Sequence, residues 1–336
     1  MRHVTHGSVL TPFAAACVLA VTLAPLDAQN RTGDTAANVP AGVQSSALPD
    51  GSVMLTDAKG MTLYTYLKDT PRESNCNDAC AKQWPPLAAT GTPPSELWTV
   101  ITRMDGSKQW AYRGKPLYGW IKDTKPGDLS GEGVAGAWRI AAVGAAPNLV
   151  RIHLAHVATA FEATPNRQSL LATAVAEAQV AAQHAALAAK AGNNLDAMKL
   201  HTGHVIHAID PSLEPMGPGL GFGVRRAAAG VVEHVQLASN VTSATNDVLT
   251  VAFRVLASAS NTVKRADEIV LVAGQVRAAA TTEEAASAVT RLSMLARALM
   301  TGVDVNQDGQ IGWQSSEGGL EQVQAQVQLM ITRAGS

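Results

Sequence analysis

The sequence predicts an α+β protein in separate domains, with an N-terminal β-rich tandem-repeat domain followed by an all-α helical bundle. Three observations support this fold class. Short strand-like segments separated by glycine- and proline-containing turns fill residues 49–143. Several of their residues recur at an offset of 54 positions. From residue 149 to 336 the chain is alanine-rich, which favours helices.

The first 28 residues have the pattern of an export signal. Arg2 precedes an apolar run at residues 9–26, and Ala28 offers a small residue for cleavage. Residues 29–48 are rich in small and polar residues without a hydrophobic period, which predicts a flexible tether. We expect a periplasmic or secreted protein without an integral membrane span after signal removal; an uncleaved anchor is the alternative. The net charge of −1 gives no reason to expect nucleic acid as a partner.

The repeat is most visible in two heptads, LYTYLKD at residues 63–69 and LYGWIKD at residues 117–123. Alternate residues of a strand share a face, so each heptad places two aromatic rings side by side. We interpret these rings as the core between two packed units, with Asp69 and Asp123 capping the turns that follow. An exposed aromatic face that binds a ligand is the alternative. The segment RMDGS at residues 103–107 predicts a hairpin turn between two further strands.

Cysteine usage predicts one disulfide. Removal of the signal also removes Cys17 and leaves Cys76 and Cys80. An even number of cysteines in an oxidising compartment favours a disulfide. The C-x3-C spacing also suits a soft metal such as copper(I), and free thiols are a third alternative.

Several motifs in order carry a resemblance to a known family. Beside the two heptads these are CNDACAKQWPPL at 76–87, DGSKQWAYRGKPLY at 105–118 and GEGVAGAW at 131–138. In these segments the chain resembles the secreted-repeat lipoproteins, which have a Tyr-x-aromatic-x-x-Asp motif. The resemblance covers about residues 50–142 and implies an exported bacterial protein, without implying a biochemical activity. The chain departs from the lipoprotein pattern because it has no convincing lipid-attachment cysteine.

Helical periodicity marks the elements of the predicted bundle. The expected helices are residues 149–161, 167–190, 195–209, 224–239, 244–278, 283–300 and 320–332. Thr281 and Glu284 have the spacing of a capping box, which predicts a helix start. In the longest segment, a stripe that includes Leu249, Phe253 and Leu256 has the spacing of a buried helix face.

The segment DVNQDGQIGWQS at residues 304–315 resembles the calcium loop of EF-hands. Its candidate ligands supply oxygen atoms at the spacing that calcium needs, and they are Asp304, Asn306, Asp308, Gln310 through its carbonyl, and Glu317. Ser315 occupies the twelfth position, where a bidentate glutamate is expected, and Glu317 substitutes for it if the next helix starts late. We expect weak calcium binding, with a Kd of about 10⁻⁴ to 10⁻³ M. A metal-free turn between two helices is the alternative.

The histidines after the signal all lie between residues 153 and 234. Several have i, i+3 spacing, which places them on one helix face. Histidines from facing helices bind transition metals or haem in helical bundles. The candidate ligands are His153, His156, His201, His204, His207 and His234, with Met198 as an axial partner. The remaining histidine, His184, is not placed in this site. Ordinary interfacial histidines, satisfied by backbone or solvent, are the alternative.

No catalytic motif is evident in the sequence. We expect an exported, non-enzymatic binding or structural protein of the bacterial envelope that holds calcium in its EF-hand-like loop. The alternative is a haem- or copper-binding protein that uses the histidine cluster for redox chemistry or metal handling. An enzyme of unrecognised type ranks third. The sequence does not predict which protein or small ligand is the partner.

Overall fold

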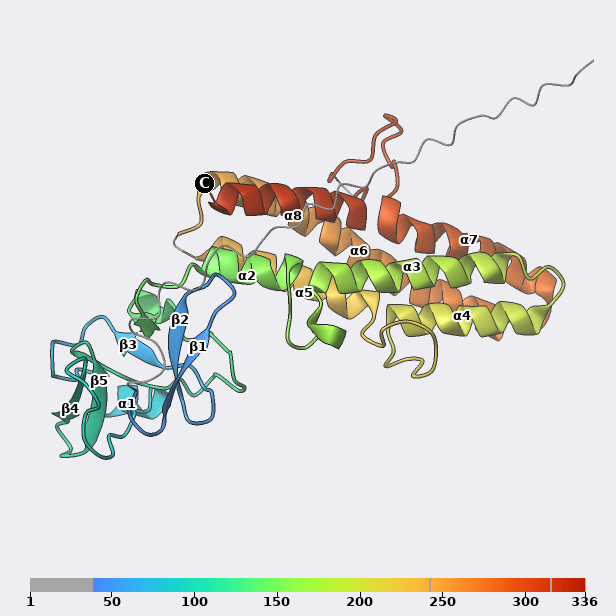
Figure 1. Ribbon diagram of the computed structural model, residues 1–336. Helices are drawn as coiled ribbons and strands as arrows, with labels where there is room; N and C mark the ends of the chain where they lie inside the picture. The colour runs from blue at the N-terminus through green and yellow to red at the C-terminus, as the bar shows by residue number, and fades with distance from the viewer. Residues whose placement is uncertain (1–38, 242, 315, 336) are drawn as a thin grey trace, which may run out of the picture.

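The computed structural model describes residues 39–241, 243–314 and 316–335, and it shows a β-rich part followed by an elongated helical bundle (Figure 1). The predicted export signal, Cys17 and Ser315 lie outside the described residues. Within the described ranges, no helix is both long and apolar enough to cross a membrane.

The strands of the described β-rich part are short and form small antiparallel sheets. The first sheet contains β1 (Val43–Ala47), β2 (Val53–Asp57) and β8 (Ala142–Val143). The second contains β3 (Tyr64–Tyr66) and β7 (Trp138–Ile140). The third contains β4 (Trp98–Thr102), β5 (Lys108–Tyr112) and β6 (Lys115–Pro116). The short helix α1 (Ala79–Gln83) lies between β3 and β4, and the 3-10 helix η1 (Val134–Gly136) precedes β7. β4 and β5 pair across the predicted turn, in which Asp105 Oδ1 accepts a hydrogen bond from Ser107 N at 2.9 Å.

β1 lies inside the segment that we expected to be a flexible tether. It pairs with β2 in antiparallel register, from Val43 opposite Asp57 to Ala47 opposite Val53. Only Val43 of this strand is buried, so the strand has no clear alternation of apolar and polar residues. The tether prediction is therefore wrong for residues 43–47. Main-chain pairing with β2 stabilises this strand, although its side-chain pattern does not indicate one.

The two heptads pair with each other in a reciprocal way. Tyr64 and Tyr118 exchange both backbone hydrogen bonds, with N···O distances of 2.8 and 3.0 Å. The Tyr64 hydroxyl donates to Asp123 Oδ2, and the Tyr118 hydroxyl donates to Asp69 Oδ2, each at 2.7 Å. Each repeat therefore uses its tyrosine to hold the aspartate of the other repeat. This cross-pairing explains why tyrosine and aspartate recur together in the motif.

The aromatic rings of the heptads lie in a core. Trp84 stacks against Trp138 and Trp120, with ring centroids 3.6 and 3.9 Å apart. Tyr64 lies edge-on to Trp84 and is fully buried. A Cβ atom on Gly131 would lie 2.7 Å from Tyr64 Cζ, so this position has no room for a larger residue. These contacts agree with the interpretation of the rings as a core between packed repeats.

The helical part contains α2 (Leu149–Ala158), α3 (Leu170–Ala189), α4 (Leu195–Ile209), α5 (Val224–Asn240), α6 (Asn246–Ala278), α7 (Thr282–Thr301) and α8 (Leu320–Gly335). A second 3-10 helix, η2 (Pro165–Arg167), precedes α3. These bounds lie close to the expected ones, because side-chain caps mark several helix starts. At the predicted capping box, Thr281 Oγ1 accepts a hydrogen bond from Glu284 N at 3.2 Å.

The buried face of α6 differs from the predicted stripe. Leu249 and Phe253 are 38% and 61% exposed, whereas Val248 and Ala252, one position earlier in each case, are buried. The prediction of the stripe was wrong at these positions. The buried face of α6 also carries polar residues, among them Arg265, so large apolar side chains alone do not mark it.

α2 belongs to the cores of both parts. Its Ile152 is fully buried among the aromatic rings of the repeats. Its Leu154 and Val157 are buried in the core of the bundle. The first helical turn is held from the repeat side, because Asn148 N donates to an oxygen of Asp50 at 2.6 Å. The helix that we expected to belong to the bundle alone therefore contributes to the cores of both parts, so the arrangement in separate domains is not confirmed.

Candidate metal centres

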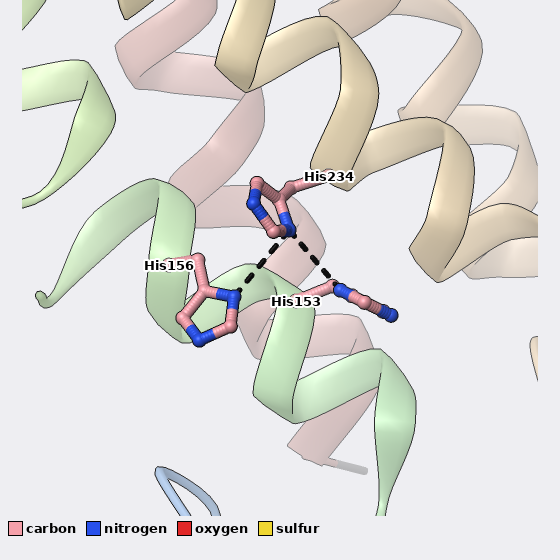
Figure 2. Close-up of side chains that lie close together, drawn as sticks. All are labelled: His153, His156 and His234. Carbon is pink, nitrogen blue, oxygen red and sulfur yellow. Dashed lines mark hydrogen bonds between the residues drawn. The ribbon is translucent and has the colours of Figure 1, made fainter. Parts of the chain in front are cut away.

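Three histidines from α2 and α5 converge beside the repeat region, and we call them the first triad. His153 and His156 lie one turn apart on α2, and His234 approaches them from α5 (Figure 2). His234 Nδ1 lies 3.1 Å from His153 Nδ1 and 3.4 Å from His156 Nδ1. The Phe161 ring packs against the rings of His156 and His234, with centroids 5.4 and 5.1 Å apart. The triad is thus partly shielded from solvent by an aromatic ring.

Burial favours neutral imidazoles in the first triad. It lowers the pKa of His153 to about 4 and of His234 to about 3, and the neighbouring imidazoles add to both shifts. Burial also lowers the pKa of His156, with a further contribution from the positive charge of Lys125 in the repeat region. Neutral imidazole is the form that coordinates metal ions, so the protonation state of the first triad at neutral pH would not oppose coordination.

A second triad lies between α3 and α4, in a hairpin that extends away from the repeats (Figure 1). His184 Nδ1 on α3 lies 3.1 Å from His201 Nδ1 and 3.2 Å from His204 Nδ1 on α4. All three side chains are partly buried. Burial and the neighbouring imidazoles lower the pKa of His184 and of His204. These two imidazoles of the second triad are therefore also biased toward the neutral form.

Both triads have the same construction, an H-x-x-H pair on one helix and a single histidine on the facing helix. Among the described residues, groups of three or more His, Cys, Asp or Glu residues with all candidate ligand atoms within 4.8 Å of one another occur at these two triads. His184 completes the second triad and was missing from the predicted site. The H-x-x-H pair signals that a third nitrogen would come from another helix, but only the packing of α3 on α4 shows that His184 supplies it.

The remaining predicted ligands of this site lie outside both triads. His207 Nδ1 lies 2.7 Å from the carbonyl oxygen of Glu214, so the buried ring donates a hydrogen bond to the backbone. Met198 is buried in the core of the bundle. His201, His204 and His207 follow one another at i, i+3 spacing, and the structure separates them. His201 and His204 belong to the second triad, whereas His207 has an ordinary structural role.

The predicted calcium loop connects α7 to α8 and projects from the bundle (Figure 1). Asp304 Oδ2 accepts a hydrogen bond from Gly309 N, and Asn306 Oδ1 accepts one from Asp308 N, each at 2.9 Å. Asp308 Oδ1 accepts one from Gln310 N at 2.8 Å. Gly309 has a φ of 81°, which suits the sharp turn of such a loop. The side-chain oxygens of Asp304, Asn306 and Asp308 thus lie close to the turn at Gly309, within one short segment of the chain.

Glu317 faces the loop from its C-terminal side. α8 begins at residue 320, after Glu317, as the substitution for Ser315 requires. The side chain is 2% exposed, and its two oxygens accept hydrogen bonds from Asn306 N at 3.4 Å and Gly312 N at 3.1 Å. Arg265 of α6 donates to the carbonyl oxygens of Glu317 and Gly318, each at 2.6 Å. This buried guanidinium holds the end of the loop in place.

Cys76 and Cys80 form a disulfide with an S–S distance of 1.99 Å. Cys76 is fully buried in the aromatic core. The buried Arg103 side chain donates a hydrogen bond to the Cys76 carbonyl oxygen at 2.5 Å. With both sulfur atoms in the disulfide, this structure offers no thiolate pair for copper(I).

The β-rich part is, by its geometry, a tandem repeat in which two similar units pair and exchange tyrosine–aspartate contacts. Residues 48–88 and 99–142 match the family described as a secreted repeat of unknown function. This match confirms the repeat family that the motifs indicated, and the two matched segments correspond to the two units. Neither the curated proteins nor the solved structures contain a match to this chain.

Proposed function

We propose that this protein is an exported binding protein for transition-metal ions, with one site in each histidine triad. The observation that supports the proposal is the spacing of the nitrogen atoms. Imidazole nitrogens lie about 2.0–2.1 Å from a bound zinc ion, so two of them at a tetrahedral angle are about 3.3–3.4 Å apart. The Nδ1 separations are 3.1 and 3.4 Å in the first triad, and 3.1 and 3.2 Å in the second. Two of the three nitrogen pairs in each triad thus have the spacing of ligands to one ion, and all candidate ligand atoms of a triad lie within 4.8 Å of one another.

The chemistry of the donors also favours a cation. His234 Nδ1 lies close to two other Nδ1 atoms, yet each neutral ring carries at most one hydrogen there. In the tautomers that carry their hydrogen on Nε2, the Nδ1 lone pairs converge and attract a positive ion placed between them. Imidazole suits zinc, copper, nickel and iron, and three protein ligands leave a fourth position for water or another ligand. We propose an ion rather than haem, because two axial imidazoles face each other across a porphyrin, which nitrogens this close do not permit.

Metal titration tests the proposal. The protein is stripped with a chelator, incubated with zinc chloride and desalted, and its zinc content is measured by elemental analysis. We expect two ions per chain in the wild type and one in either His234→Gln or His184→Gln. His207→Gln is the matched control, since it removes a buried histidine from the same helix as His201 and His204, and it should retain two ions. Wild-type protein that holds no zinc, or equal losses in all three variants, would contradict the proposal.

We infer weak calcium binding by the loop of residues 304–317 as a second function. The observation that favours it is the buried Glu317 carboxylate, which accepts hydrogen bonds from Asn306 N and Gly312 N of the loop and could substitute for the missing twelfth-position glutamate. Calcium there would clip α7 to α8, with an affinity in the weak, extracellular range. Calorimetric titration with millimolar calcium should show heat, and the melting temperature should rise. The absence of both effects would refute the inference.

A further inference from the structure

We propose that the ion in the first triad is a structural clip that fastens the repeat region to the helical bundle. This inference rests on the metal binding proposed above and adds a role for one of the two sites. It concerns α2, because this helix carries two ligands of the triad and also contributes a side chain to the core of the repeats.

α2 presents different faces to the two parts of the protein. Ile152, next to the ligand His153, is fully buried among the aromatic rings of the repeats. His153 and His156 point toward α5, where His234 supplies the third nitrogen (Figure 2). A bound ion would therefore fix the position of α2 on α5. Through Ile152 it would also hold the aromatic core of the repeats against the bundle.

The surroundings of the first triad place it at the border between the two parts. Burial is the main cause of the lowered pKa of His156 and of His234, and the charge of Lys125, which belongs to the second repeat, adds to both shifts. Asp50 of the repeat region accepts a hydrogen bond from Asn148 N at the start of α2. Thus the charge of the repeat region acts on the triad, and a carboxylate of the repeat region holds the start of the helix that carries it.

The second triad lacks this connection. His184, His201 and His204 lie on α3 and α4, and no residue of these two helices belongs to the described aromatic core of the repeats. An ion there would join two helices of the bundle to each other. The second triad therefore provides an internal control for any effect that zinc has on the repeats.

Tryptophan emission separates the two parts experimentally. Five of the six tryptophans lie in the repeat region, and these are Trp84, Trp98, Trp110, Trp120 and Trp138. The sixth, Trp313, lies near α6, where its ring packs against Phe253 with centroids 5.4 Å apart. In a Trp313→Phe background, emission during urea unfolding therefore reports the repeats alone, while circular dichroism at 222 nm reports the helices. Zinc content is measured on the same samples.

At a zinc concentration of about 100 times the Kd, the emission midpoint should rise by roughly 1 M urea. The same rise is expected in His184→Gln, and none in His234→Gln or His156→Gln, which provide two independent losses of the first site. In Ile152→Ala, zinc should still bind and raise the helical midpoint, while the emission midpoint stays constant. Zinc bound at the first triad without any shift in emission would overturn the clip and leave the proposed function intact. No zinc binding at either triad would overturn both.

Discussion

Replacing Tyr64 by phenylalanine tests the cross-pairing of the two repeats. The hydroxyl donates to Asp123 Oδ2 at 2.7 Å and accepts a hydrogen bond from Gly131 N at 3.2 Å. A hydrogen bond to a charged group contributes about 1.5–3 kcal/mol, and a buried N–H left without an acceptor costs about 1 kcal/mol or more. Tyr64→Phe should therefore destabilise the protein by about 2–4 kcal/mol. The loss arises from unpaired polar groups, because the ring itself stays in place.

Tyr118→Phe provides the comparison within the same protein. The Tyr118 hydroxyl donates to Asp69 Oδ2 at 2.7 Å and also lies 2.8 Å from Ser74 Oγ, and Asp69 is less buried than Asp123. Water can replace the lost donor more easily at Asp69, so Tyr118→Phe should destabilise less than Tyr64→Phe. Urea unfolding followed by tryptophan emission measures both values.

A double-mutant cycle assigns the effect to the pair. Tyr64→Phe combined with Asp123→Asn should give a coupling energy of about 1–2 kcal/mol. Burial raises the pKa of Asp123, and loss of the Tyr64 donor should raise it further. The penalty of Tyr64→Phe should therefore shrink as the pH falls and Asp123 becomes protonated. A penalty below about 0.5 kcal/mol, or two mutations whose effects simply add, would refute the cross-pairing as a source of stability.

Three further predictions concern the metal centres. In metal-free protein, burial lowers the pKa of His153 to about 4 and of His234 to about 3, so the unfolded chain takes up protons below about pH 6.5 before the folded one does. The contribution of these two groups to the free energy of unfolding is complete above that pH and should fall by about 1.4 kcal/mol per group and pH unit below it. Urea unfolding at pH 7.5 and at pH 5.5 should therefore give a smaller difference in the free energy of unfolding when both residues are replaced by glutamine. Lys125→Gln should strengthen zinc binding at the first triad by about 3- to 10-fold, since a nearby positive charge is removed, and competition with a chromophoric chelator should show no change at the second triad. Glu317→Gln should abolish the calcium-dependent rise in melting temperature, whereas Glu321→Gln, an exposed change on α8, should preserve it.

Much of the fold could be predicted because its signals are local. Helix starts follow from caps such as Thr281, which bonds Glu284 N within one turn. The repeat was visible because the same residue types return in one register along the chain. β1 escaped prediction because its stability comes from pairing with β2, a contact that its own serine-rich residues do not reveal. The buried face of α6 escaped in part because Arg265 on that face is satisfied by carbonyl oxygens of a segment more than fifty residues away.

The candidate site was only half predictable for the same reason. The i, i+3 spacing on one helix shows which histidines share a face, and it correctly grouped His153 with His156 and His201 with His204. Which helix supplies the third ligand depends on how the bundle packs. The pairing of α2 with α5 and of α3 with α4 brings His234 to one pair and His184 to the other. Helix spacing alone could not assign these partners. It also could not show that His207 Nδ1 donates its hydrogen bond to a backbone carbonyl oxygen.

His207 shows what a structural histidine looks like in this bundle. It is buried and satisfies its Nδ1 with the carbonyl oxygen of Glu214 at 2.7 Å. The six histidines of the triads instead turn their Nδ1 atoms toward the Nδ1 atoms of other histidines, at separations of 3.1 to 3.4 Å. Helix packing alone gives no reason for the same three-nitrogen arrangement to arise twice, on two different pairs of helices. Under our proposal, a metal ion of imidazole-binding type is the shared ligand of both arrangements.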